Sequence, residues 1–397
     1  MRISDITVRN IFDSRGEPTI EIGIRCGERT HSAQIPSGKS RGTREASVFA
    51  PAEAAASVRF LRELMCVRSF SSIAEIDTFL FSYDGTSTKT TIGGNVALGI
   101  SIAATRALAE ERKKEVWELI REEYFATTKK DTPPLIFSNF INGGAHAHNT
   151  LDVQEYLVIA RTGASMRETV EKLISLYRKT GDYLKQIRGL KSIPIGDEGG
   201  YSLDFEDNFA PLSLLDKLIR EHGFGGVWFL GIDAAASHFG GKGLYVFEGK
   251  QMERKALAER YERYAAELGS LMSFEDPFGE DDAEGFSLMR RALPDRWIVG
   301  DDLTTTDAGA IRKHAEGGAI NAVIVKPNQI GTVTESCKAI IAARSCGAKV
   351  IISHRSGETD DAFIIQLAKA AGADGVKIGA PVKERLTKFN ELMRLYS

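Results

Sequence analysis

The chain has 397 residues, of which 43% are hydrophobic and 26% charged, and its formal net charge at pH 7 is −3. That length predicts two domains, and the charge gives no reason to expect a nucleic acid or a membrane surface as a partner. The cysteines form no Cys-x-x-Cys pair, which favours free thiols in a reducing compartment. No secretory signal or membrane-length apolar run is present. These features predict a soluble, cytoplasmic protein.

The first 130 residues predict a small α+β domain. The alternating segments ITVRNIF and TIEIGIRC indicate two antiparallel strands joined by the turn DSRGEP. Helical patterns follow at about residues 43–64 and 95–113. The polar segment TTKKDTPP (127–134) ends in two prolines, which the interior of a helix or strand does not accept. We therefore expect an N-terminal capping domain at 1–130 and a catalytic domain at 131–397.

From residue 135 onward, short apolar runs alternate with amphipathic stretches of helical length, including a long one at about 167–187. Strand-like runs occur at 135–141, 151–160, 193–196, 227–232, 271–275, 296–300, 321–326, 349–353 and 373–378. Buried strands that alternate with helices are typical of a parallel βα barrel. The runs slightly exceed the eight strands of such a barrel, so we expect that some are irregular or that the barrel begins unusually.

Three of these runs end in a carboxylate: Asp233 ends VWFLGID, Glu275 ends LMSFE and Asp301 ends WIVGD. The C-terminal ends of barrel strands meet at one mouth, where active sites lie. Carboxylates gathered there would repel one another without a cation, and a hard divalent cation prefers oxygen ligands. The pattern predicts a metal site, the alternative being that each residue caps a helix or forms an ion pair. Spacing leaves Asp276 and Asp302 open as alternative ligands.

Lys326 ends another apolar run, NAVIV. A lysine at the inner end of a buried strand loses hydration, which lowers its pKa and suits it to accept a proton. A cation that only balances the acidic cluster would occupy the same position. The position alone does not separate these two roles.

Two further carboxylates suggest proton transfer. Glu198 lies in IPIGDEGGY, and Glu155 lies in DVQEY on the preceding predicted strand. Two carboxyl groups on neighbouring strands can share a proton, which keeps one of them protonated as a general acid. Each segment taken alone is equally compatible with an ordinary turn or strand edge.

The segment His354-Arg355-Ser356-Gly357 follows the run VIIS. Arginine binds phosphate or carboxylate through two parallel hydrogen bonds, and a Ser-Gly turn offers backbone donors. An exposed turn with a capping serine is the alternative. We expect an anion site because both charged side chains sit at the predicted mouth.

Two glycine-containing loops complete the pattern. PSGKS (36–40) is similar to part of a P-loop, but Ala33 stands where that motif requires glycine, so nucleotide binding is rejected. A loop that reaches over the mouth is the better interpretation, with a plain connector as the alternative. NGGAHAHN (142–149) holds two histidines at a spacing that is poor for joint zinc ligation.

Together these segments resemble the enolase family. The matching segments are DSRGEPTIE, PSGKSRG, NGGAHAHN, QEY, GDEGG, GIDAAAS, FEDPFGEDD, GDDLTTT, KPNQIGT, SHRSGET and KIGAPVKERLTKFN. They occur in the family's order over nearly the whole chain. The wider superfamily of racemases and lactonising enzymes would not share SHRSGET or the SRGxPT opening, so the ordered set is highly specific.

The resemblance implies a fold, an activity and a cofactor. The fold is an α/β barrel of the type ββαα(βα)6 with a small α+β N-terminal domain, which accounts for the surplus strand-like run. The activity is the Mg²⁺-dependent reversible dehydration of 2-phosphoglycerate to phosphoenolpyruvate in glycolysis and gluconeogenesis. One Mg²⁺ is expected firmly and a second on substrate binding. The implied partners are the small phosphorylated acid and further copies of the chain, in a homodimer or larger homo-oligomer.

The resemblance also implies roles for individual residues. Those implied to hold Mg²⁺ are Asp233, Glu275 and Asp301 for the first ion and Ser40 for the second. Those implied to act in catalysis are Lys326 as the base at C2, Glu198 supported by Glu155 as the acid at the C3 hydroxyl, and His354. Those implied to bind substrate are His146 on a closing loop, Gln154, Arg355 and Ser356 at the phosphate, and Lys377 at the carboxylate.

Some positions depart from the family pattern. Lys39 and Arg41 replace a small residue and a threonine in the loop, and His148 replaces glycine or aspartate. Two extra cations could weaken the second metal site or answer an additional negative charge on the substrate. An enolase-like lyase for a related phosphorylated or phosphonate carboxylic acid is therefore the alternative function. A non-catalytic scaffold is a third hypothesis, disfavoured because no core residue is lost.

Overall fold

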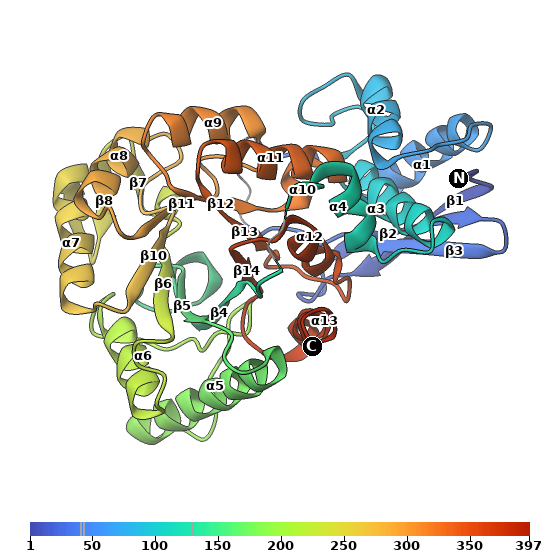
Figure 1. Ribbon diagram of the computed structural model, residues 1–397. Coiled ribbons are helices and arrows are strands. Elements are labelled where there is room, and N and C mark those ends of the chain that lie inside the picture. The colour runs from blue at the N-terminus through green and yellow to red at the C-terminus, as the bar shows by residue number, and fades with distance from the viewer. Residues whose placement is uncertain (40–41, 43, 129–130) are drawn as a thin grey trace.

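The computed structural model describes residues 1–39, 42, 44–128 and 131–397. Figure 1 shows two parts side by side: a three-stranded sheet with its helices, in blue and cyan, and a closed barrel with outer helices, in green to red. No helix in these described ranges has both the length and the apolar character that crossing a membrane requires.

The N-terminal sheet is antiparallel and carries helices on one side. Its strands are β1 (Asp5–Phe12), β2 (Pro18–Cys26) and β3 (Arg29–Gln34), and its helices are α1 (Pro51–Met65), α2 (Ile73–Asp84), α3 (Gly94–Glu111) and α4 (Val116–Tyr124). The alternating isoleucines of β2 are buried, and α3 approaches them closely, since a Cβ at Gly99 would lie 2.4 Å from Ile22. A glycine at this position therefore lets helix and sheet pack together.

The predicted hairpin is confirmed, with Asp5 paired to Arg25 and Phe12 paired to Pro18. Strand β3 was not predicted, because its polar sequence RTHSAQ lacks a strand pattern. The helix predicted at 43–64 begins only at Pro51, which occupies the first helical turn, where its missing N–H costs nothing. The helix predicted at 95–113 is confirmed as α3.

The barrel has eight strands, as the fold class predicted from the sequence requires. They are β4 (Leu135–Asn142), β5 (Glu155–Ala160), β6 (Phe229–Asp233), β10 (Leu271–Glu275), β11 (Trp297–Gly300), β12 (Ala322–Val325), β13 (Lys349–Ser353) and β14 (Gly375–Lys377). Strand β14 closes the barrel by pairing in parallel with β4. Strand β5 runs antiparallel to both of its neighbours, β4 and β6. The barrel therefore opens with two strands before its first helices.

The outer helices follow from the same sequence pattern. They are α5 (Met166–Arg188), α6 (Ala210–Glu221), α7 (Arg254–Glu267), α8 (Ala283–Ala292), α9 (Ala308–Glu316), α10 (Pro327–Ile330), α11 (Val333–Ser345), α12 (Phe363–Ala371) and α13 (Leu386–Leu395). The run at 193–196 is not a strand: Ile195 forms only an isolated bridge with Tyr201, and Pro194 lacks a donor for a ladder. A small sheet of β7 (Gly240–Gly241), β8 (Leu244–Phe247) and β9 (Lys250–Glu253) was not predicted.

The first turn of helix α11, on the outside of the barrel, is hydrogen-bonded to residues of the N-terminal helices. The Thr334 N–H donates to Asp77 Oδ2 at 2.8 Å, and the Val333 N–H donates to Ser101 Oγ at 3.0 Å. Lys89, which is fully buried, pairs with Glu335 at 2.8 Å. The first N–H groups of a helix have no intrahelical partner, and these side chains supply one. Polar contacts as well as apolar packing thus join the two parts.

We predict that Asp77 makes stability depend on pH. Burial raises the pKa of Asp77 to about 6, against the opposing hydrogen bonds from Ser101 and Thr334. Because the folded-state pKa exceeds the unfolded one, the stability that the protonated carboxyl contributes is present at low pH and lost as pH rises through about 6. Asp77→Asn keeps the acceptor oxygen and should gain up to about 3 kcal/mol relative to wild type over that range.

Urea unfolding of both proteins between acidic and neutral pH would measure this difference. A stability difference between Asp77→Asn and wild type that stays constant across the range would contradict the assignment.

Candidate active site

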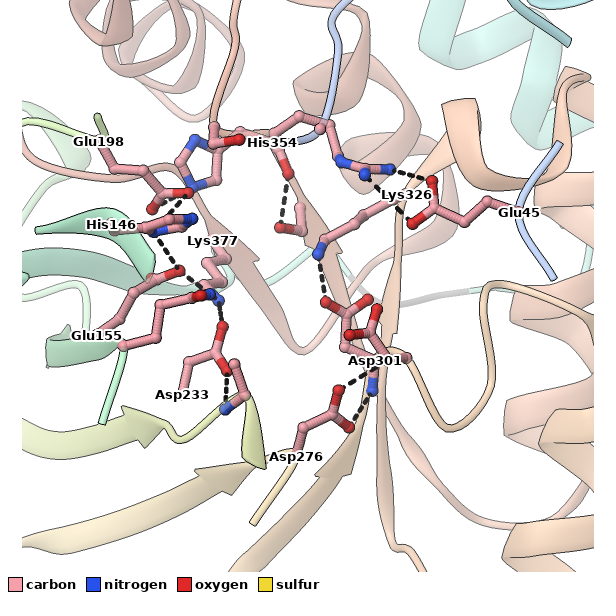
Figure 2. Close-up of a pocket in the computed structure, with 17 residues that line it drawn as sticks. Glu45, His146, Glu155, Glu198, Asp233, Asp276, Asp301, Lys326, His354 and Lys377 are labelled. Carbon is pink, nitrogen blue, oxygen red and sulfur yellow. Dashed lines mark hydrogen bonds and ion pairs between the residues drawn. The ribbon is translucent and has the colours of Figure 1, made fainter. Parts of the chain in front are cut away.

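The residues predicted at the strand ends meet in one pocket at the mouth of the barrel. Figure 2 draws the 17 residues that line it. The pocket includes these predicted site residues: His146, Gln154, Glu155, Glu198, Asp233, Asp301, Lys326, His354, Arg355, Ser356 and Lys377. Glu275 is not among the lining residues, but it accepts a hydrogen bond from Lys377, which does line the pocket. Ser40 and Arg41 lie outside the described residues.

Strand register explains why three of the carboxylates lie together. Asp233 at the end of β6 pairs with Glu155 on β5 and with Glu275 on β10, so the three stand on adjacent strands at one level. Neighbouring strands are only about 4.8 Å apart, which forces the carboxyl groups into proximity. All three are buried.

Lys377, at the end of β14, is the cation that balances this group. Its Nζ lies 2.8 Å from Asp233 Oδ2, 2.8 Å from both carboxylate oxygens of Glu275 and 3.3 Å from Glu155 Oε1. Burial alone would lower the pKa of Lys377, but these carboxylates outweigh burial and raise it well above its usual value. Lys377 therefore stays an ammonium. A divalent cation bound by Asp233 and Glu275 would compete with it for the same oxygens.

The third predicted metal ligand is engaged differently. Asp301 forms an ion pair with Lys326 and accepts a hydrogen bond from Gln329 Nε2 at 3.1 Å. Burial is the largest single influence on the pKa of Lys326 and lowers it, but the nearby carboxylates, Asp301 foremost and Glu275 as well, together raise that pKa above its usual value. The lowered pKa that we expected from burial is therefore wrong for this structure, because the expectation left out the carboxylate beside the ammonium.

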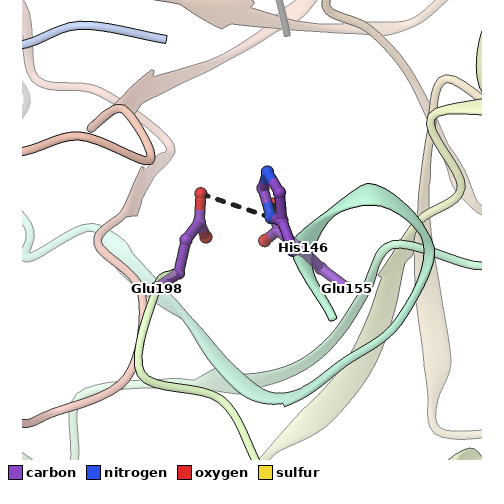
Figure 3. Close-up of side chains that lie close together, drawn as sticks. All are labelled: His146, Glu155 and Glu198. Atoms are coloured by element: carbon purple, nitrogen blue, oxygen red, sulfur yellow. Dashed lines mark ion pairs between the residues drawn. The ribbon is translucent and has the colours of Figure 1, made fainter. Parts of the chain in front are cut away.

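Two groups of described residues bring three possible metal ligands within 4.8 Å of one another. One is Asp276, Asp301 and Asp302, and the other is His146, Glu155 and Glu198 (Figure 3). Asp233, Glu275 and Asp301 do not form such a group, because Lys377 holds the first two and Lys326 holds the third.

Asp276, one of the alternative ligands, has a structural role. Its two carboxylate oxygens accept the N–H groups of Asp301 at 2.9 Å and Asp302 at 2.7 Å. It therefore fixes the turn after β11 on which Asp301 stands.

The charge balance of the pocket fits a bound divalent cation. Seven carboxyl groups line it, against the three permanent cations Lys326, Arg355 and Lys377. Burial raises the pKa of Glu155, Glu275 and Asp276, with repulsion from neighbouring carboxylates adding to the shift. Burial also lowers the pKa of His354 to about 4 and lowers that of His146, so both imidazoles are neutral near pH 7. Hard oxygen donors in such excess are the set that Mg²⁺ prefers.

The proton-transfer candidates form a second cluster. His354 Nε2 lies 3.3 Å from Glu198 Oε2, and His146 Nδ1 lies 3.8 Å from both Glu155 Oε1 and Glu198 Oε1. Burial and the neighbouring charge of Glu198 raise the pKa of Glu155 well above its usual value. Burial also acts on Glu198, but His354 and His146 outweigh it and hold the pKa of Glu198 well below its usual value. Opposite shifts in the two carboxyl groups favour Glu155 as the one that keeps a proton, and the sharing of that proton stays a prediction. Gln154 beside Glu155 is buried, and its side-chain oxygen has no hydrogen-bond partner among the described residues.

The anion segment after β13 is in contact with the loop that follows β3. Arg355 forms two hydrogen bonds to Glu45, at 3.0 and 3.2 Å, and a third to Asn328 Oδ1 at 3.1 Å. The Lys39 N–H donates to Ser356 Oγ at 2.9 Å, and Lys39 Nζ pairs with Asp197 at 2.9 Å. The loop thus reaches over the mouth, as predicted.

Sequence analysis missed several residues of this site. Glu45 and Asn328 were not identified, because no local motif marks them. Arg385 was also missed: it is fully buried and donates from Nη2 to the carbonyl of Ser356 at 2.8 Å. Its segment, KERLTKFN, matched the family, and a charged residue in a helical pattern gave no further signal. His148, a departure from the family, is exposed and does not line the pocket.

Comparison with known proteins gives the same picture over the whole length. The family model described as the enolase N-terminal domain matches residues 3–120, and the one described as the enolase C-terminal TIM barrel domain matches residues 131–397. The chain belongs to the enolase family. It is 35% identical to the enolase of Thermococcus kodakarensis, with 99% of this chain and 94% of that protein covered. The enolases of Methanocaldococcus jannaschii and Neorickettsia sennetsu are each 36% identical, covering 99% of this chain and 94% and 98% of the relative.

Arg385 offers a test of how the enolase-type site is supported. Its buried guanidinium joins the carbonyl of Ser356 to that of Asp197, the latter at 3.4 Å. Removing it in Arg385→Met leaves buried acceptors unsatisfied, which should lower the free energy of unfolding by about 1–3 kcal/mol.

Arg290→Met is the matched control, since Arg290 donates to the Pro294 carbonyl at the surface. Urea denaturation of both variants would give the comparison. Equal losses in the two variants would show that burial of Arg385 adds nothing.

Proposed function

We propose that this chain catalyses the Mg²⁺-dependent, reversible dehydration of 2-phosphoglycerate to phosphoenolpyruvate. The observation that carries the proposal is the placement of Lys326 across the pocket from Glu198 and His354, above a crowded carboxylate group (Figure 2). A base on one side and an acid on the other suit the removal of a proton and a hydroxyl from adjacent carbons. The family's named relatives, aligned over almost the whole chain, support the same reaction.

In the proposed reaction, Lys326 acts as the neutral amine, which it can become once Mg²⁺ takes over the Asp301 carboxylate that now pairs with its ammonium. Its Nζ then takes the proton from C2, and the electron pair of the broken C–H bond forms the new C2–C3 double bond. The C3–O bond breaks, and Glu198 gives the departing hydroxyl the proton that makes it water. Because the pKa of Glu198 is held well below its usual value and that of Glu155 well above, Glu155 would first pass its proton to Glu198. His146 and His354, both neutral, orient Glu198 through the contacts described above.

Asp233, Glu275 and Asp301 are proposed to hold one Mg²⁺, and Ser40 a second that arrives with the substrate. Bound there, Mg²⁺ would neutralise the additional negative charge that appears when the C2 proton leaves. Arg355 and Ser356 would hold the phosphate and Lys377 the carboxylate, with Gln154 lining the same wall. Asp302 remains an alternative metal ligand, since it stands beside Asp301 in one of the two ligand groups.

The alternative function, a lyase for a related and more highly charged acid, rested on the extra cations near the loop. Lys39 is one of these, and its ammonium pairs with Asp197 at 2.9 Å. A cation that already has an anionic partner does not call for another negative charge on the substrate. This contact favours 2-phosphoglycerate over a more highly charged relative.

The wider setting of the enzyme is also a proposal. We propose that residues 1–130 and 131–397 are its two domains, and that it works in glycolysis or gluconeogenesis in the cytoplasm. The match to the N-terminal family model ends at residue 120 and the match to the barrel model begins at residue 131, which supports the division. We further propose a homodimer or larger homo-oligomer, by analogy with the family.

The reaction is tested by mixing the purified protein with 2-phosphoglycerate and Mg²⁺ and following the ultraviolet absorbance of the enol product. Lys326→Ala should lower the turnover rate by at least about a hundredfold, since general-base catalysis contributes that much or more. Circular dichroism should show an unchanged fold. A folded variant that keeps more than about a hundredth of the wild-type rate would remove Lys326 from the proposed role.

Metal dependence has its own test. A chelator should abolish turnover, and Mg²⁺ added to the metal-free protein should raise its melting temperature, because a ligand bound only by the folded state stabilises it. Asp233→Asn should lose most of this thermal shift. Full activity in excess chelator, or an undiminished shift in the variant, would argue against the proposed metal ligands.

A further inference from the structure

Both residues proposed to hold the substrate phosphate are already bonded to the segment that follows β3. The Arg355 guanidinium donates two hydrogen bonds to the carboxylate of Glu45, and Ser356 Oγ accepts a hydrogen bond from the N–H of Lys39. Glu45 and Arg355 line the same pocket (Figure 2). The contact therefore lies inside the site rather than behind it.

The contact between Glu45 and Arg355 has the geometry of anion recognition. Each carboxylate oxygen takes a different terminal nitrogen of the guanidinium, at 3.0 and 3.2 Å, and the two side chains are only 6% and 4% exposed. The guanidinium fork presents its parallel donors to carboxylates and phosphates alike. Glu45 thus makes the bonds that two phosphate oxygens would make.

Neighbouring donors hold Glu45 in this position. Its Oε1 accepts the N–H of Gly42 at 3.1 Å and a weaker hydrogen bond from Gln329 Nε2 at 3.4 Å. Asn328 Oδ1 takes another hydrogen of the Arg355 guanidinium at 3.1 Å. Protein groups rather than water therefore surround the carboxylate and its partner.

We propose that Glu45 is an internal ligand of the anion site, whose carboxylate occupies the place on Arg355 that the phosphate of the substrate takes. The inference rests on the proposed function for the identity of that phosphate. Binding of phosphate then displaces Glu45 from the guanidinium. A phosphate dianion brings more charge to Arg355 than the single charge of a carboxylate, so it can win the exchange.

Displacing Glu45 from Arg355 costs free energy, and this cost lowers the affinity of the site for phosphate. Phosphate binds Arg355 more weakly than it would bind a guanidinium without a carboxylate on it. The opposite role is that Glu45 only orients Arg355 and stays in place when phosphate binds. In that case removal of its charge would weaken phosphate binding, so the two roles predict changes of opposite sign.

The test uses the Mg²⁺-loaded full chain and inorganic phosphate as the probe, with titration calorimetry as the readout. Glu45→Gln keeps the size and one acceptor oxygen but removes the charge. We expect it to bind phosphate about tenfold more tightly than wild type, which corresponds to about 1.4 kcal/mol. Glu63→Gln, a change of the same charge on the exposed face of α1, should bind as wild type does. Arg355→Met should lose phosphate binding.

Unchanged or weaker phosphate binding by Glu45→Gln would overturn the inference, and so would full binding by Arg355→Met. Kinetics with 2-phosphoglycerate adds a second readout: the variant should show a lower KM, without the rise that loss of an orienting residue would cause. The proposed function fails separately. If wild type does not turn over 2-phosphoglycerate but Glu45→Gln still gains phosphate affinity, the substrate is wrong and the internal ligand stands.

Discussion

The mouth of the barrel depends on one electrostatic constraint: carboxyl groups from adjacent strands are packed closer together than their charges allow. Glu155, Asp233 and Glu275 share one register level, and Lys377 enters the middle of them. In a buried setting such a group persists only if cations or protons balance it. The same excess of oxygen donors that makes the arrangement costly makes it a good host for a divalent cation.

The reversed direction of β5 contributes to this arrangement. Residues that end a parallel strand reach the mouth, whereas β5 runs antiparallel to β4 and β6 and brings its first residue, Glu155, to the same level. Glu155 can therefore stand between the cluster around Lys377 and the pair of His146 and Glu198. The unusual opening of the barrel is thus what connects the proposed metal side to the proposed acid side.

Sequence alone could predict the barrel and most of its mouth. A residue at the C-terminal end of a barrel strand lies at the mouth regardless of how the side chains around it pack. Asp233, Lys326 and Lys377 were found in this way. The pKa direction of Lys326 could not be predicted, since it depends on which carboxylate turns toward the ammonium. Glu45, Asn328 and Arg385 were missed for a related reason. They lie on loops and on a helical segment whose position relative to the site is set by tertiary packing. The periodicity of the sequence does not indicate that position.

The two sides of the site differ in what positions them. Asp233 and Glu275 stand on barrel strands, whose ladder holds them to one register, and Lys326 directly follows the last residue of β12. Arg355 and Ser356 instead contact Glu45 and Lys39, which come from the segment after the first sheet. Substitutions in that segment can retune anion binding without touching the groups proposed for proton transfer. This separation lets the loop vary at a residue such as Lys39 while the residues at the strand ends stay where the barrel places them.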